Sequence, residues 1–297
     1  MESSDDDGDA HTAAFTRMLF VLVLLFPALQ KKTTDFKPPV IRTVFAEKPP
    51  ALPTPPVVQK KKAPVKKKKV YITFDDGPNK GTKNVYHIVR DEQVPVTFFI
   101  VGEHVFASVG QSRMWDSLKM AEQIAICNHS YTHANGRYEK FYNDPEAVVD
   151  DFRRAQDSLQ FDNAIIRTPG RNIWRIDSLK FTDIRKSTAA ADSLQKAGFV
   201  IMGWDLEWHF DHKTMRVTST GAKMVESIDS IFRTNRTRSP GHLVLLAHDQ
   251  AYVQSGDSLE LRQFLQLLKQ KDEYEVCLAT AYPGVSRPLA DSVVVPQ

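Results

Sequence analysis

From residue 70 onward, short apolar runs alternate with amphipathic stretches along the chain. The apolar runs predict strands at 70–74, 96–101, 164–166, 199–204, 243–247 and 274–279. The amphipathic stretches predict helices around 85–89 and over 147–159, 187–197, 224–232 and 259–269. Asp144 and Pro145 supply a cap and a first-turn residue to the helix that follows them. Such alternation predicts a single α/β domain with a parallel sheet, arranged as a barrel.

The chain before residue 70 has a different pattern. Residues 18–29 are apolar throughout and directly follow Arg17. This run is shorter than the stretch of about 20 apolar residues that spans a bilayer, and it matches the apolar core of a secretory signal. The residues before Arg17 are acidic, which is atypical of a signal, and no clean cleavage site follows closely. Residues 1–30 are therefore interpreted as either a signal peptide or a short, retained membrane anchor.

Residues 31–69 form a predicted disordered linker. They hold eight of the 17 prolines and two lysine runs, at 60–62 and 66–69. This composition cannot bury enough apolar surface to fold. The lysines either bind an anionic polymer or lipid, or form a solvated spacer that repels itself. The expected divisions are thus 1–30, 31–69, a folded domain over 70–285 and a C-terminal tail over 286–297.

The net charge of +3 is unevenly distributed. Residues 31–70 contain eleven lysines and Arg42 against Asp35 and Glu47, whereas residues 1–30 sum to −4. Residues 71–297 therefore sum to −3. A folded part with this charge shows no bulk attraction to nucleic acid, so we expect no nucleic-acid partner.

The two cysteines, Cys127 and Cys277, do not form a CxxC pair, which excludes a cysteine zinc site. One disulfide is arithmetically possible. We expect two buried thiols instead, because free cysteine usually packs as a small hydrophobe.

Polar clusters follow several predicted strands, at the end where parallel α/β folds place their active sites. Asp75 and Asp76 are adjacent carboxylates that point in different directions, so one can bind a metal while the other acts on water. His129 and His133, at i and i+4, share one face of a helical turn and can hold a single ion. Together with Asp76 they make a three-ligand set, which is the arrangement of catalytic rather than structural zinc.

Two more clusters occupy similar positions. Arg167 follows the strand at 164–166 and could orient a carboxylate through a bidentate contact. Pro169 and Gly170 form a turn whose N–H groups could face an oxyanion. His248 follows the strand at 243–247, where it could act as a general acid or base.

In their order and spacing these motifs resemble the polysaccharide deacetylase family, the NodB-like carbohydrate esterases. The resemblance covers about residues 68–285. Thr73–Pro78 matches the family's first motif, His129–His133 its His-Ser/Thr-x-x-His motif, Arg167–Pro169 its Arg-x-Pro motif and Leu246–His248 its Leu-x-His motif, and Val96–Phe99 with Gly102 resembles its second strand.

The resemblance implies a distorted (β/α) barrel and a divalent metal, usually zinc, for which cobalt or nickel could compete. It implies that Asp75 is the general base, that Arg167 holds Asp75 and that His248 is the general acid. The implied metal ligands are Asp76, His129 and His133.

Two departures from the family pattern concern the substrate side of the site. Gly170 and Arg171 stand where the family often has an aromatic residue followed by Gly or Asn, so part of a sugar-facing wall is lost and a cation is gained. Gly170 keeps the backbone donor expected at an oxyanion. The fourth motif of the family usually reads Asp-x-x-Asp-Trp, and here the sequence is WDLEW. Either Asp205 or Glu207 is expected to support His248, with Glu207 favoured, and Trp208 is expected on the substrate side.

The resemblance implies an exported hydrolase that removes N-acetyl groups from a polysaccharide of the N-acetylglucosamine type, in the periplasm, at the cell envelope or outside the cell. Association with a membrane through residues 1–30 is an open alternative. The remaining alternatives are a deacetylase of an O-acetylated glycan or a small amide, and a catalytically inactive glycan-binding relative. The sequence leaves the oligomeric state open.

Overall fold

A computed structural model describes residues 66–285. The predicted signal or anchor, the disordered character of the linker up to residue 65 and the C-terminal tail lie outside these residues. Within 66–285, none of the helices combines the length and hydropathy that are needed to cross a membrane.

The centre of the fold is one mixed, ten-stranded sheet in the order β6-β5-β7-β4-β3-β2-β1-β11-β8, with β12 also paired to β1. Its strands are β1 (Lys68–Gly77), β2 (Val96–Ile100), β3 (Ile124–Asn128), β4 (Ile165–Ile166), β5 (Ile173–Ile176), β6 (Leu179–Thr182), β7 (Val200–Ile201), β8 (Leu206–Glu207), β11 (His242–His248) and β12 (Tyr274–Val276). All pairings are parallel except those of β5 with β6 and with β7. A separate antiparallel pair joins β9 (Phe210–Asp211) to β10 (Arg216–Val217).

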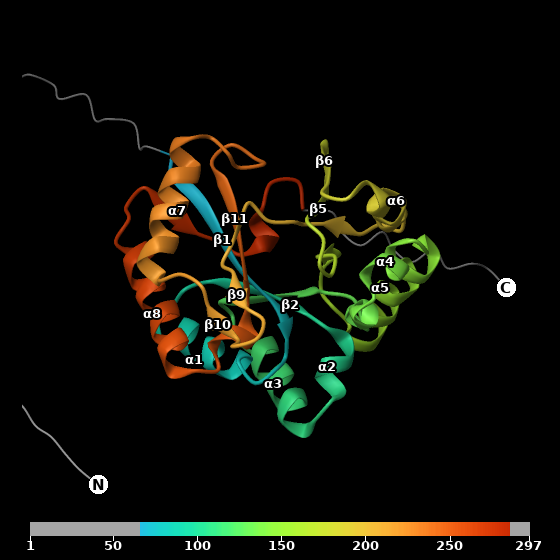
Figure 1. The fold of residues 1–297 in the computed structure, drawn as a ribbon, viewed down its shortest axis with the longest axis horizontal. Coiled ribbons are helices and arrows are strands. Elements are labelled where there is room, and N and C mark those ends of the chain that lie inside the picture. Colours follow the sequence, from blue (N-terminus) through green and yellow to red (C-terminus); the bar gives the residue numbers. More distant parts are fainter. Residues whose placement is uncertain (1–65, 286–297) are drawn as a thin grey trace, which may run out of the picture. The chain divides into compact units, whose positions relative to one another are not determined.

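Helices cover the sheet, with α1, α7 and α8 packed together near β1 and β11, and α5 against α6 beside β5 (Figure 1). The helices are α1 (Thr82–Asp91), α2 (Gly102–Phe106), α3 (Val109–Lys119), α4 (Tyr138–Tyr142), α5 (Pro145–Leu159), α6 (Thr188–Lys196), α7 (Gly221–Arg233) and α8 (Ser255–Lys269). As predicted, Asp144 caps α5, because its side chain accepts a hydrogen bond from the Ala147 N–H.

The expected α/β class and distorted barrel are confirmed, in the form of a sheet that curls without closing, because no strand of the described part joins β6 to β8. Every predicted strand and helix is present. The sequence interpretation missed α2, α3, α4, β3, the short strands β8, β9 and β10, and the β5–β6 hairpin. The hairpin makes the sheet mixed rather than purely parallel. The first strand also begins at Lys68, two residues before the apolar run.

Alternation along β1 divides its side chains between two environments. Ile72 and Phe74 pack in the large apolar core with helix residues such as Val85 and Phe264. Tyr71 lies in a second apolar cluster on the other face of the sheet. Because side chains alternate along a strand, Asp75 shares the face of Tyr71, and this places its carboxylate on the inner side of the curl.

Both cysteines are free thiols. Cys127 is fully buried in the second apolar cluster and Cys277 is half-buried at its edge. Burial raises the pKa of the Cys127 thiol to about 12, so this thiol stays protonated and packs as a hydrophobe.

Candidate metal and catalytic site

The carboxyl ends of β1, β3 and β11 and the segment after β4 meet around a cavity of about 530 Å³. Most of the residues that the sequence singled out line this cavity: Asp75, Asp76, His129, His133, Gly170, Glu207 and His248. Tyr138, Phe210 and Gln250 also line it. Parallel strands bring these positions together because their carboxyl ends lie at one edge of the sheet.

Three potential ligands converge on one point of the cavity wall. The Oδ1 atom of Asp76 lies 3.1 Å from His133 Nε2 and 3.4 Å from His129 Nε2. One ligand atom from each of these residues lies within 4.8 Å of the others. His129 Nδ1 is 2.9 Å from the carbonyl oxygen of Arg167, which can only accept, so Nδ1 carries a proton and Nε2 is the nitrogen directed toward Asp76. The donor set therefore fits a divalent metal with two imidazole ligands and one carboxylate.

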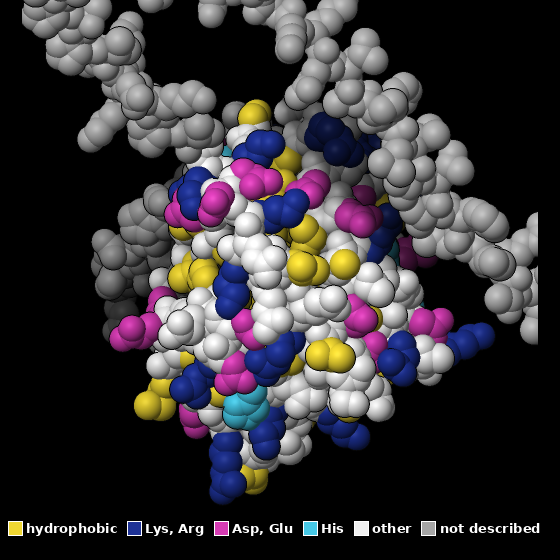
Figure 2. Space-filling model, turned by 90° about the vertical axis from the view of Figure 1, so that its left-hand side faces the viewer, with side chains coloured by type: hydrophobic (Ala, Val, Ile, Leu, Met, Phe, Trp, Pro, Cys, Tyr) yellow, Lys and Arg dark blue, Asp and Glu magenta, His cyan; other side chains and the backbone are white. Residues whose placement is uncertain are grey.

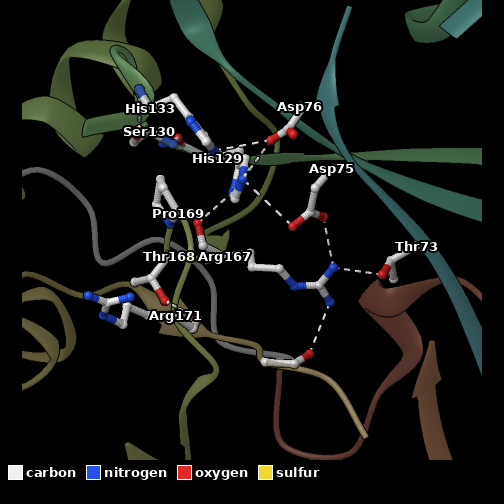
Figure 3. A network of polar contacts seen from close by, with 12 residues as sticks. Thr73, Asp75, Asp76, His129, Ser130, His133, Arg167, Thr168, Pro169 and Arg171 are labelled. Carbon is white, nitrogen blue, oxygen red and sulfur yellow. Dashed lines mark hydrogen bonds and ion pairs between the residues drawn. The ribbon is translucent and has the colours of Figure 1, made fainter. Parts of the chain in front are cut away.

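The two histidines do not share a helical turn, so that expectation is wrong. Ser130 and His133 have positive φ angles of 67° and 50°, and the segment is a loop that follows β3. The Ser130 hydroxyl accepts a hydrogen bond from the His133 N–H at 3.0 Å. Asp151 on α5 accepts hydrogen bonds from the N–H groups of Tyr131 and Thr132. These contacts fold the loop so that both rings point toward Asp76 (Figure 3).

Asp75 is held by Arg167, as expected. The Arg167 Nη1 donates to Asp75 Oδ1 at 2.8 Å and to the Thr73 hydroxyl at 2.6 Å (Figure 3). Its Nε and Nη2 donate to the carbonyl oxygens of Met202 and Gly203. Arg167 is fully buried, and a buried guanidinium requires a paired carboxylate and satisfied N–H groups, both of which are present. The other oxygen of Asp75 faces the three potential ligands, 3.6 Å from His129 Nε2.

The charges around Asp76, His129 and His133, here called the metal trio, favour the binding of a cation. Burial alone would raise the pKa of Asp76, but hydrogen bonds and charge interactions with His129 and His133 hold that pKa well below its usual value. Burial would lower the pKa of His129, yet the neighbouring carboxylates of Asp75 and Asp76 raise it. Two carboxylates in a buried pocket thus create a negative field that a proton or a metal ion can neutralise.

Sequence reasoning missed a group of residues that hold the loop after β1. Gln250 Nε2 donates to Asp76 Oδ2 at 3.1 Å. Asp249 is fully buried and accepts hydrogen bonds from the Thr82 hydroxyl and the Asn79 side-chain amide. Burial raises the pKa of Asp249 to about 7. The signal was available, because Asp249 and Gln250 directly follow His248 after a predicted strand.

His248 lines the cavity beside Phe210, whose ring centre is 5.2 Å from its own. Within residues 66–285, no hydrogen bond or ion pair joins it to Asp205 or Glu207, and its Nδ1 is buried without a partner. Glu207 instead lies 3.2 Å from His209 Nδ1. Asp205 accepts from the N–H groups of Val244 and Arg238. The expected carboxylate support of His248 is therefore not seen in this structure.

Gly170 lies at the rim of the cavity with a φ of 61°, a conformation that glycine adopts without strain. Trp208 does not reach the cavity, contrary to expectation. Its ring is 1% exposed, packs between Tyr252 and Phe264, and donates from Nε1 to the carbonyl oxygen of Ser219. The side chain turns into the core because β8 pairs with β11 and leaves only Glu207 facing the cavity.

Comparisons with known proteins agree with the motifs and the fold. The family model described as polysaccharide deacetylase matches residues 62–169. The polysaccharide deacetylase homologue YheN of Bacillus subtilis is 26% identical over 191 residues, which are 61% of this chain and 58% of that protein. A chitooligosaccharide deacetylase of Bradyrhizobium is 38% identical over 65 residues, which are 22% of this chain and 28% of that protein. The chain thus spans less than two thirds of the length of these relatives.

Among solved structures, a CE4 esterase of Streptococcus mutans superposes with a TM-score of 0.54 and 22% identity. The superposition covers 71% of this chain and 86% of that one. At this level of identity the likeness concerns the fold. The matching family model, the relatives and the shared fold, taken with the motif residues gathered around one cavity, show that this chain is similar to polysaccharide deacetylases.

Proposed function

We propose that this protein is a metal-dependent hydrolase that removes N-acetyl groups from a polysaccharide of the N-acetylglucosamine type. The observation that carries the proposal is the arrangement of Asp75, held by buried Arg167, beside the convergent ligands Asp76, His129 and His133. The named activity of the chitooligosaccharide deacetylase relative supports the choice of substrate class.

Asp75 acts as the general base in this proposal. The guanidinium of Arg167 pairs with one carboxylate oxygen and fixes the orientation of the side chain, so that the other oxygen stays available on the cavity side. The same oxygen lies beside the metal trio, where a water molecule can be held close to it.

Asp76, His129 and His133 would hold the metal, and two imidazole nitrogens with one carboxylate oxygen suit zinc, for which cobalt or nickel could compete. A bound zinc ion supplies Lewis acidity to a carbonyl oxygen and acidifies a bound water. Gln250 fixes the other oxygen of Asp76 and so directs Oδ1 toward the histidines.

His248 acts as the general acid, because it lines the cavity with Asp75 and can donate a proton to the leaving amine. The Gly170 N–H is proposed to stabilise negative charge that develops on the acetamide oxygen. The need for ionised Asp75 together with protonated His248 leads us to expect a bell-shaped dependence of kcat on pH.

We further propose that the protein is exported and works at or near the cell envelope, because polymeric glycans of this class lie outside the cytoplasm and residues 18–29 resemble an export signal or short anchor. Cell fractionation with an antibody against residues 66–285 tests this. Recovery in the cytoplasmic fraction alone would contradict it and would favour a small amide substrate.

Acetate release from a panel of chitin oligomers, peptidoglycan and acetylated xylan tests the activity. We expect release from the N-acetylated polymers, loss of release after chelation, and recovery when zinc is added back. Release from acetylated xylan alone would replace N-deacetylation by O-deacetylation. No release from any of these polymers by metal-loaded protein would remove the proposed function.

A further inference from the structure

A second hollow adjoins the catalytic cavity, with a volume of about 740 Å³. Tyr138 lines both the hollow and the cavity. The other residues that matter here are Arg137, Glu139, Lys140 and Arg171. Arg171 directly follows Gly170 at the rim of the cavity, so the two spaces are joined by backbone as well as by the tyrosine ring.

Cationic side chains outnumber carboxylates around this hollow. Arg137, Lys140 and Arg171 line it with only one carboxylate, that of Glu139. Glu139 already pairs with Lys186, at 2.9 Å. Among residues 66–285, Arg171 forms no ion pair, whereas other arginines such as Arg175 and Arg262 do. The hollow therefore offers positive charge that the protein itself does not neutralise.

Contacts with two tyrosine rings and a backbone carbonyl hold the Arg171 side chain in place. Its guanidinium carbon lies 5.9 Å from the ring centre of Tyr138 and 5.5 Å from that of Tyr142. The Tyr142 hydroxyl donates to the carbonyl oxygen of Pro169 at 2.7 Å, which fixes one of these rings. Arg171 Nη1 donates to the carbonyl oxygen of Gly170, and no hydrogen bond within residues 66–285 engages its Nη2. Such partial engagement by the protein leaves capacity for an external acceptor.

One aromatic ring separates this arginine from the metal trio. The Tyr138 ring stands edge-on to the His133 ring, with their centres 5.8 Å apart, and the guanidinium of Arg171 lies beyond it. Figure 3 shows Arg171 directed away from the network of Asp75 and Arg167. A group bound by Arg171 would thus belong to the same glycan as the reacting acetamide without contacting the reacting atoms.

We propose that the hollow around Arg171 binds a carboxylate of the glycan substrate, and that the protein prefers N-acetylated glycans that carry acidic substituents over neutral ones. This inference rests on the proposed function. The planar guanidinium matches carboxylate geometry, and the tyrosines that stack on it reduce the cost of holding it in place. Arg171 also stands where the sequence departs from the family pattern, so it is a residue that can distinguish the substrate of this chain.

The test compares two forms of one substrate. The probe is an oligosaccharide of peptidoglycan that carries lactyl carboxylates, used either as the free acid or with those carboxyls converted to methyl amides. We expect kcat/KM for acetate release to be about tenfold higher for the free acid, mainly through KM, because hydrogen bonds to a charged group contribute about that factor. This preference should shrink at high salt, since the cations of the hollow are partly exposed.

Arg171→Gln should lower the ratio of kcat/KM for the free acid to kcat/KM for the methyl amide toward one. Arg171→Lys should retain part of this preference for the free acid. The matched control is Arg153→Gln, at an exposed arginine on α5 that lies outside both spaces. Its preference should equal that of the wild-type protein. An unchanged preference in Arg171→Gln, or equal kcat/KM for the two forms with the wild-type protein, would overturn the inference while leaving the deacetylase activity intact.

Calorimetric titration of the full chain with the same two oligosaccharides separates this inference from the proposed function. Tighter binding of the free acid that is lost in Arg171→Gln would support the carboxylate site even if no acetate were released. Acetate release from the neutral oligomers with no difference in binding would support the enzyme and refute the carboxylate site.

Discussion

The buried side chain of Arg167 holds several groups in place beside the proposed catalytic cavity. It has no contact with solvent, yet it donates to Asp75, to Thr73 and to backbone carbonyl groups. Removing either partner of such a pair leaves an uncompensated buried charge, which typically costs about 3–5 kcal/mol. Both residues therefore contribute to stability as well as to the site, so a substitution at either one is compared with the wild-type protein in thermal unfolding as well as in activity.

Asp75→Asn should reduce kcat at least about 100-fold, because the amide keeps the shape of the carboxylate and can still accept from Arg167, but it cannot remove a proton. Zinc binding should persist, since Asp75 is not one of the proposed ligands. The measurements are acetate release and zinc content of the same preparation. Asp116→Asn, at an exposed acid on α3, serves as the control. Near-normal kcat in Asp75→Asn would exclude this residue as the base.

Asp249 should make stability depend on pH. Burial raises its pKa in the folded protein to about 7, above the value of about 3.9 in an unfolded chain. Between these two values the folded state retains a proton that the unfolded state loses. The stabilising contribution of protonated Asp249 to the free energy of unfolding is therefore fully present below about pH 4 and is lost as pH rises through 7.

The difference in free energy of unfolding between the wild-type protein and Asp249→Asn isolates this effect. The free energy of unfolding of the wild-type protein, relative to that of Asp249→Asn, should fall by at most about 4 kcal/mol between pH 4 and pH 7. Urea denaturation at several pH values measures it. A difference that is flat across this range would show that Asp249 keeps an ordinary pKa.

At the scale of elements, the loop that carries both histidine ligands depends on its neighbours. The first two N–H groups of α2, from Gly102 and Glu103, donate to the carbonyl oxygens of Ser130 and Tyr131 at 2.9 Å. Asp151 of α5 accepts from the other side of the loop. The positive φ angles of Ser130 and His133 are thus maintained by contacts with two helices.

Gly102→Ala should weaken metal binding about tenfold, because displacing the residues that orient a ligand commonly costs 10- to 100-fold in affinity. A Cβ at this position would lie 2.6 Å from Tyr131 Cδ2 and 3.1 Å from Tyr131 Cα, so the histidine loop must shift. The measurement is the zinc dissociation constant from competition with a chelator.

Gly110→Ala on α3 is the matched control. The Cβ there would have its nearest neighbour at 3.8 Å, and alanine favours a helix over glycine. Zinc affinity should be unchanged in this variant. Equal affinities in the Gly102 and Gly110 variants would show that the histidine loop does not depend on close packing against α2.

At the scale of the molecule, the charge of the folded part is mixed rather than basic. Figure 2 shows acidic and basic side chains intermixed on the face over α7 and α8. Several form ion pairs there, such as Lys223 with Glu226 and Lys271 with Asp229. Recognition of nucleic acid relies on a clustered basic surface, and this face does not present one.

Limited trypsin digestion should remove the residues before the domain and stop at Lys67. The N–H groups of Lys68 and Lys69 donate to the carbonyl oxygens of Glu273 and Gly241, so cleavage after either lysine would cut into β1. The retained fragment, identified by mass spectrometry, should bind zinc and release acetate like the full chain. A protected core that includes residues 31–59 would contradict the proposed linker.

The sequence by itself predicted most of the elements and the three residues that converge as potential metal ligands. Strand and helix periodicities are local properties, and residues that follow parallel strands meet at one edge of a sheet whatever the details of packing. Asp75, Asp76, His129, His133, Arg167 and His248 could therefore be singled out before the structure was known. The sequence could not indicate the antiparallel pairing of β5 with β7, because that pairing depends on which edge of the sheet is free.

Only the tertiary structure decided which neighbours each of these residues has. Trp208 and Glu207 are adjacent in sequence, yet one is buried in the core and the other faces the cavity, because the pairing of β8 with β11 sets their register. The contact of Gln250 with Asp76 and the stacking of Arg171 on Tyr138 join residues from separate segments. Such contacts arise from packing between distant parts of the chain, which local patterns do not encode.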